Sequence, residues 1–167
     1  MHAVIMAGGS GSRIHNPGKM LLKIGGNSLI SHVIEELENA NIKFSICVSS
    51  NTPEVIFNMS PHIIYGNGNY IHDLKLSVNR FPQYVLIISA DLLFSSSTLS
   101  EFISKSYKIG SGITTLAINH KAVGISIFFE KIGDAELNYT SIDIDDTAFF
   151  NINTENDYRR AELYYKR

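Results

Sequence analysis

A glycine-rich segment close to the start of the chain combines a flexible backbone with positively charged side chains. The residues that could surround a phosphate group are Ala7, Gly8, Gly9, Ser10, Gly11, Ser12 and Arg13, followed by Lys19. Three glycines within four positions let successive backbone N–H groups converge on an anion. Arg13 and Lys19 would add positive charge at the same place. The segment predicts a phosphate-binding loop, and a glycine turn without a ligand is the alternative.

Two well-known phosphate-binding motifs do not fit this loop. A P-loop has Ser or Thr after its lysine, whereas Lys19 is followed by Met20. The dinucleotide-binding fingerprint would need a glycine in place of Ile14. Neither motif therefore accounts for the segment.

Asp91 supplies a carboxylate at the end of a second apolar run. The run Val85–Ala90 is typical of a buried strand, and Asp91 follows it directly. Ligands of open α/β sheets bind beyond the carboxyl ends of the strands, so we expect Asp91 at the same edge as the glycine-rich loop. Magnesium takes oxygen ligands, usually one or two carboxylates plus substrate phosphates. Asp91 is the candidate Mg²⁺ ligand, and a helix cap or loop aspartate is the alternative.

The rest of the chain alternates between strand-like and helix-like segments. The expected strands are Ala3–Met6, Phe44–Val48, His62–Tyr65, Tyr84–Ile88, Ile113–Ile118 and Val123–Phe129. The expected helices are Ser28–Asn39, Ile71–Arg80, Ser97–Tyr107 and Glu155–Tyr165. Thr154 and Asp157 have the spacing of a capping box at the start of the last helix. This order predicts an α/β protein with a mostly parallel sheet.

Length, charge and hydrophobicity limit the class of protein. The 167 residues suit one domain, 1–167. With 14 basic and 16 acidic residues and no long basic run, a nucleic-acid partner is not expected. No segment has the ~20 apolar residues of a membrane span, and Met1–Met6 lacks the features of a signal peptide, so we expect a cytoplasmic protein. The oligomeric state stays open, with a homodimer as one alternative.

The opening segments resemble a known enzyme signature. Met6–Arg13, Lys19 and Leu21–Ile30 together resemble the nucleotidyltransferases related to molybdenum-cofactor guanylyltransferase and the sugar-nucleotide pyrophosphorylases. The resemblance implies a Rossmann-like three-layer α/β/α fold in which the loop wraps a triphosphate that Arg13 and Lys19 neutralise. It also implies that Lys19 is needed for turnover and that Asp91 binds the metal. The family usually has proline where this chain has Met20.

Two later segments are similar to the archaeal adenosylcobinamide-phosphate guanylyltransferases. These are Gly66–Leu74 and Phe150–Asp157. The similarity implies transfer of GMP from GTP, with Mg²⁺, to the phosphate of adenosylcobinamide phosphate and release of pyrophosphate. Gly66 and Gly68 lie just before an expected helix, where a nucleotide could approach the backbone closely, and an ordinary strand-to-helix turn is the alternative. Asp73 is a further candidate nucleotide contact, and Asn153 is a candidate contact to nucleotide or water. Distant relatives have an aspartate where this chain has Asn153, so only Asp91 is expected to supply a protein carboxylate to the metal.

The resemblance is weakest over 95–119 and 130–147, so the acceptor is the least determined part of the hypothesis. A molybdopterin acceptor is the first alternative, and it keeps the same chemistry. The second alternative is a non-catalytic regulatory protein that binds GTP. The simultaneous presence of Arg13, Lys19 and Asp91 favours an enzyme, because a protein that only binds nucleotide has less need of all three.

Overall fold

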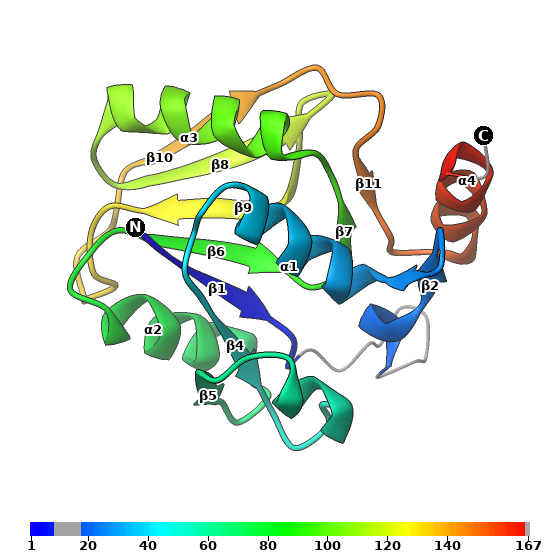
Figure 1. Ribbon diagram of the computed structural model, residues 1–167. Coiled ribbons are helices and arrows are strands. Elements are labelled where there is room, and N and C mark those ends of the chain that lie inside the picture. Colours follow the sequence, from blue (N-terminus) through cyan, green and yellow to red (C-terminus); the bar gives the residue numbers. More distant parts are fainter. Residues whose placement is uncertain (9–17, 166–167) are drawn as a thin grey trace.

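A computed structural model describes residues 1–8 and 18–165. A seven-stranded sheet forms the centre of this part of the chain (Figure 1). Its strands are β1 (His2–Met6), β4 (Phe44–Val48), β5 (Ile63–Tyr65), β6 (Val85–Ser89), β8 (Ile113–Ile118), β9 (Lys121–Phe128) and β10 (Tyr139–Asp143). Their order is β10-β8-β9-β6-β1-β4-β5. Strand β9 is antiparallel to both neighbours and every other neighbouring pair is parallel, which confirms the mostly parallel sheet.

Four α-helices in the described residues lie close to the expected ranges. They are α1 (Leu29–Asn39), α2 (Tyr70–Arg80), α3 (Ser96–Ile109) and α4 (Glu155–Tyr165). Short polar side chains accept backbone N–H bonds where the first two helices begin: Ser28 Oγ accepts from Ser31 N at 3.3 Å, and Asn69 Oδ1 accepts from His72 N at 3.0 Å. Such N-caps satisfy N–H groups that have no partner within the helix, which fixes where each helix starts.

The helices cover both faces of the sheet because β1 alternates its side chains between two cores. Ala3 and Ile5 pack in the larger core, together with apolar residues of α1 and α3. Val4 points the other way, into a core that includes Val78 of α2. Figure 1 shows α1 and α3 on one side of the sheet and α2 on the other. The expected three-layer α/β/α arrangement is therefore confirmed.

A small third core holds α4 against short segments from other parts of the chain. Strand β2 (Lys23–Ile24) pairs with β3 (Asn27–Ser28), and β7 (Leu92–Leu93) pairs with β11 (Phe150–Asn151). The buried residues of this core are Ile24, Leu29, Leu93, Ile152 and Ala161. The Tyr158 hydroxyl also donates to the Lys23 carbonyl oxygen at 2.8 Å. In Figure 1 these elements gather at the side toward which the arrows of β1 and β6 point.

The predicted capping box at the start of α4 is present. Asp157 N donates to Thr154 Oγ1 at 3.1 Å, and Thr154 N donates to Asp157 Oδ2 at 2.8 Å. Asn153 N donates to the same carboxylate oxygen at 3.1 Å. The cap therefore fixes the backbone of Asn153 as well as the first turn of the helix.

The sixth expected strand begins two residues earlier than the sequence indicated. Strand β9 starts at Lys121 because β8 and β9 form a hairpin through Asn119 and His120. These two residues have φ values of 51° and 62°, which a tight two-residue hairpin turn requires. None of the described helices has the length and the apolar character needed to cross a membrane.

Candidate active site

Four neighbouring parallel strands end at the same edge of the sheet, and a candidate residue follows each of them. In spatial order the strands are β6, β1, β4 and β5. Asp91 lies beyond β6, Gly8 beyond β1, Ser49 beyond β4 and Gly66 beyond β5. This is the edge where ligands bind in open α/β sheets. The fold therefore brings Ala7 and Gly8, the described start of the predicted phosphate loop, to the same edge of the sheet as Asp91, the predicted metal ligand.

Lys19 makes the central contact of this edge. Its Nζ donates to Asp91 Oδ2 at 2.5 Å and to Asn153 Oδ1 at 3.2 Å. The Lys19 side chain is 12% exposed and that of Asp91 is 23% exposed, so the ion pair is partly shielded but still open to solvent. Three residues singled out from distant parts of the sequence are thus in direct contact.

Local structure holds each partner of Lys19 in place. Lys19 begins a short 3₁₀ helix, η1 (Lys19–Leu21), which is anchored in the larger core by the buried side chain of Met20. The backbone N–H of Ile152 donates to the Asp91 carbonyl oxygen at 3.1 Å, which joins β11 to the end of β6. Asn153 Nδ2 donates to Asn151 Oδ1 at 2.7 Å, which leaves Asn153 Oδ1 directed toward the ammonium group.

Two residues that the sequence analysis did not single out support the start of the glycine-rich segment. Ser49 Oγ donates to the Gly8 carbonyl oxygen at 2.9 Å, and Thr52 Oγ1 donates to that of Ala7 at 3.1 Å. A Cβ atom at Gly8 would lie only 3.3 Å from Ser49 N and Cβ, so a larger residue would crowd this contact. In the sequence, the feature that could have pointed to these two residues is the polar segment that directly follows the buried strand β4.

The segment after β5 is fixed by Asp73, which is buried in α2. Its carboxylate accepts from the backbone N–H groups of Asn67 at 2.8 Å and Gly68 at 3.0 Å, and lies 3.0 Å from His72 Nδ1. Burial alone would raise the pKa of Asp73, but the hydrogen bonds from His72, Asn67 and Gly68 outweigh it and lower the pKa. A Cβ atom at Gly66 would approach both carboxylate oxygens to 2.5 Å.

Asp73 is therefore a positioning residue for the loop between β5 and α2, since its carboxylate is bonded to that loop. A direct nucleotide contact of Gly66, Gly68 or Asp73 stays a prediction. The remaining members of the expected phosphate site lie outside the described residues, and their roles also stay predictions; these are Gly9, Ser10, Gly11, Ser12 and Arg13.

Comparison with known proteins agrees with this arrangement. Residues 3–131 match the family model of the MobA-like NTP transferase domain. The chain is 30% identical to the adenosylcobinamide-phosphate guanylyltransferase of Methanocaldococcus jannaschii over 193 aligned positions, which cover 100% of this chain and 98% of that protein.

Two solved structures share the fold at low sequence identity. One is the 4-diphosphocytidyl-2C-methyl-D-erythritol synthase of Anaerococcus prevotii, with a TM-score of 0.72 and 15% identity over 99% of this chain and 98% of that one. The other is Rv0371c of Mycobacterium tuberculosis in complex with manganese, with a TM-score of 0.71 and 14% identity over 97% of each chain. The family match covers more than half of the sequence, and the chain belongs to the MobA-like NTP transferases, a family of nucleotidyltransferases.

Proposed function

We propose that this protein transfers GMP from GTP to the phosphate group of adenosylcobinamide phosphate and releases pyrophosphate. The full-length similarity to the enzyme of Methanocaldococcus jannaschii that carries this name supports the choice of acceptor. The observation that carries the chemistry is the contact of Lys19 with Asp91 and Asn153 at the carboxyl edge of the sheet. The cytoplasm, which supplies GTP and magnesium, is the compartment that the proposal implies.

The reaction needs charge stabilisation more than acid–base chemistry. An oxygen of the acceptor phosphate attacks the α-phosphorus of GTP, a new P–O bond forms, and the bond to the β-phosphate bridging oxygen breaks. The acceptor phosphate is already ionised near neutral pH, so no general base is required. Lys19 and Arg13 balance the negative charge of the triphosphate, and the N–H groups of the glycine-rich loop bind it.

Asp91 and Asn153 decide where the ammonium group of Lys19 is held. Two oxygen atoms restrict its position, because Asp91 Oδ2 lies 2.5 Å and Asn153 Oδ1 lies 3.2 Å from the ammonium nitrogen. A preorganised cation stabilises developing charge without reorganisation during the reaction. Both side chains come from segments joined by the β7–β11 pairing, so the cation and its supports form one unit.

The same edge suits a divalent cation, with Mg²⁺ as the proposed ion. Asp91 supplies a partly exposed carboxylate oxygen, the kind of ligand that Mg²⁺ prefers alongside waters and substrate phosphates. The amide of Asn153 is a weaker donor, so a single protein carboxylate is proposed. The bound ion would neutralise the triphosphate and polarise its phosphoryl oxygens. The manganese complex of Rv0371c supports the use of a divalent ion within this fold.

The reaction can be tested by measuring pyrophosphate release with each of the four nucleoside triphosphates, with and without acceptor. We expect release that requires GTP, Mg²⁺ and adenosylcobinamide phosphate together, with one pyrophosphate formed for each GMP transferred. Pyrophosphate release with molybdopterin in place of adenosylcobinamide phosphate would show that molybdopterin is the acceptor, which is the first alternative. GTP binding with no release for any acceptor would refute the proposal in favour of a regulatory protein.

A further inference from the structure

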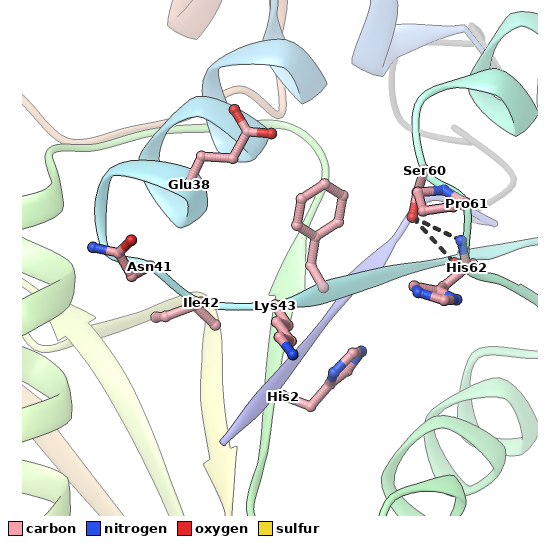
Figure 2. Close-up of a pocket in the computed structure, with 9 residues that line it drawn as sticks. His2, Glu38, Asn41, Ile42, Lys43, Ser60, Pro61 and His62 are labelled. Carbon is pink, nitrogen blue, oxygen red and sulfur yellow. Dashed lines mark hydrogen bonds between the residues drawn. The ribbon is translucent and has the colours of Figure 1, made fainter.

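A pocket of about 580 Å³ lies at the opposite edge of the sheet, where β1, β4 and β5 begin (Figure 2). We call it the amino-edge pocket and define it by its lining residues His2, Glu38, Asn41, Ile42, Lys43, Phe44, Ser60, Pro61 and His62. A second pocket of about 390 Å³ shares His2, Pro61 and His62 with it and extends the hollow to Arg80 and Phe81. Strand β1 separates this hollow from the candidate active site by roughly 15–20 Å, at ~3.3 Å per residue.

Positively charged and titratable groups outnumber acids in the amino-edge pocket. Figure 2 shows the side chains of His2, Lys43 and His62 on the same side of β4. Burial lowers the pKa of His2, and the nearby His62, the Met1 amino group and Lys43 lower it further. Glu38 is the acidic residue among those that line the pocket, and in Figure 2 it is drawn away from this group. A bound anion would offset the nearby charges that lower the pKa of His2.

The walls also provide flat and apolar surface. The His2 ring stacks on Phe81 with centroids 4.0 Å apart and planes 21° apart. A hydrogen bond of 2.9 Å between His2 Nε2 and Ser45 Oγ fixes the ring in that position. Phe44 and Pro61 line the same hollow. Apolar walls with a few convergent polar groups are typical of small-molecule sites.

We propose that the amino-edge pocket binds a phosphate monoester of an aromatic compound, independently of the nucleotide site. The phosphate would lie between Lys43 and His62, and the ring would pack against Phe44 and Pro61. A phosphate suits the site better than a carboxylate because Lys43 and two imidazole side chains line it, and a phosphate monoester carries up to two negative charges and can accept several hydrogen bonds at once. Nothing in the proposed transfer reaction uses these residues.

Phenyl phosphate is the probe. Inorganic phosphate, which keeps only the charged group, and phenol, which keeps only the aromatic ring, are the comparison ligands. Binding to the full chain is measured by calorimetry, and the imidazole signals of His2 and His62 are followed by NMR. We expect 1:1 binding of phenyl phosphate, with roughly tenfold weaker binding of inorganic phosphate and no saturable binding of phenol up to about 10 mM. The His2 and His62 signals should shift with the same dissociation constant.

Matched variants locate the site. Lys43→Ala and His62→Ala should each weaken phenyl phosphate binding roughly tenfold, whereas Lys43→Arg keeps it. Lys43 and His62 are both exposed, so neither variant should unfold the protein. Lys108→Ala, on the exposed surface of α3, is the control for loss of one charge and should bind like the unsubstituted chain. Lys19→Ala should also bind normally, because the nucleotide site is at the other edge.

Two results would overturn the inference. One is the absence of saturable phenyl phosphate binding up to about 10 mM. The other is binding that Lys19→Ala abolishes while Lys43→Ala and His62→Ala leave it intact, since the probe would then occupy the nucleotide site. Neither result depends on whether the protein transfers GMP.

Discussion

Lys19 Nζ lies 2.5 Å from Asp91 Oδ2, although the two residues are 72 positions apart in the chain. One comes from the segment that follows the glycine-rich loop, and the other from the end of β6. In a partly shielded pair each charge fixes the position of the other. The contact therefore joins Lys19, predicted to neutralise the triphosphate, to the predicted metal ligand, and the first two predictions test its two partners.

Replacement of Lys19 with Ala should lower kcat for pyrophosphate release by about 10²–10³, because a preorganised charge on the triphosphate is lost. Lys23→Ala is the matched control: this lysine is exposed on β2, a few residues from the site, and its removal should leave the rate unchanged. Circular dichroism and thermal unfolding check that both variants stay folded. A near-normal rate for Lys19→Ala would remove the lysine from the mechanism.

Loss of the Asp91 carboxylate should weaken metal binding as well as turnover. In Asp91→Ala we expect a fall in rate of at least ~10² and a shift of half-maximal activation to higher Mg²⁺ concentration. The measurement is a magnesium titration of pyrophosphate release at saturating GTP. Asp134→Ala removes a carboxylate that is exposed on the surface, so its magnesium curve should match that of the unsubstituted protein. An unchanged magnesium curve for Asp91→Ala would place the metal elsewhere.

Helices and long strands could be predicted from the sequence because their signals are local. The apolar stripe of α1 and the Thr154–Asp157 cap of α4 placed these helices to within a residue. The short strands carry no such signal, since two residues show no periodicity. The β7–β11 pairing was therefore missed, as was the insertion of the antiparallel β9 between β6 and β8.

From the sequence, only those site residues could be predicted that follow an apolar strand or belong to a glycine-rich segment. Asp91 was found because it follows a buried strand. Ser49 also follows one, but a serine there has many structural explanations, and its bond to the Gly8 carbonyl depends on the neighbouring positions of β1 and β4. The burial of Asp73 under its own loop is likewise a tertiary feature.

Ser49 should influence GTP binding more than the chemical step. Ser49→Ala removes the hydroxyl that donates to the Gly8 carbonyl oxygen, which loosens the start of the phosphate loop. We expect KM for GTP to rise about three- to tenfold with little change in kcat, the effect of one neutral hydrogen bond. Ser100→Ala, exposed on α3, is the control. A fall in kcat at constant KM would indicate a direct role in catalysis.

Gly66 should not tolerate a side chain. In Gly66→Ala the new Cβ atom would lie 2.5 Å from both Asp73 carboxylate oxygens, so the loop or the buried carboxylate must move. The expected loss in free energy of unfolding is about 1–3 kcal/mol. Gly133→Ala is the matched control, since nothing lies within 4 Å of its Cβ position. Urea denaturation of the two variants provides the comparison, and equal stability would show that the loop adjusts freely.

The carboxylate of Asp73 should make stability depend on acid pH. Its hydrogen bonds lower the pKa in the folded protein below the ordinary value of 3.8, so folding favours the charged form. Its contribution to stability is therefore complete above the unfolded pKa and is lost as the pH falls through the folded pKa. Asp73→Asn cannot titrate, and it places an amide where two backbone N–H groups require acceptors. We expect it to cost about 1.5–3 kcal/mol near pH 7.

The difference in free energy of unfolding between Asp73→Asn and the unsubstituted protein should narrow as the pH falls below about 4. Protonation of Asp73 then removes the same charged acceptor from the unsubstituted protein. Urea denaturation at a series of pH values measures this difference directly. Asp134→Asn, the control, removes an exposed carboxylate, so its free energy of unfolding should equal that of the unsubstituted protein at every pH. The loss of unfolding free energy in Asp73→Asn could instead stay constant from pH 7 down to pH 3. The charge on Asp73 would then not be what holds the loop, and an uncharged side chain of the same shape would be sufficient.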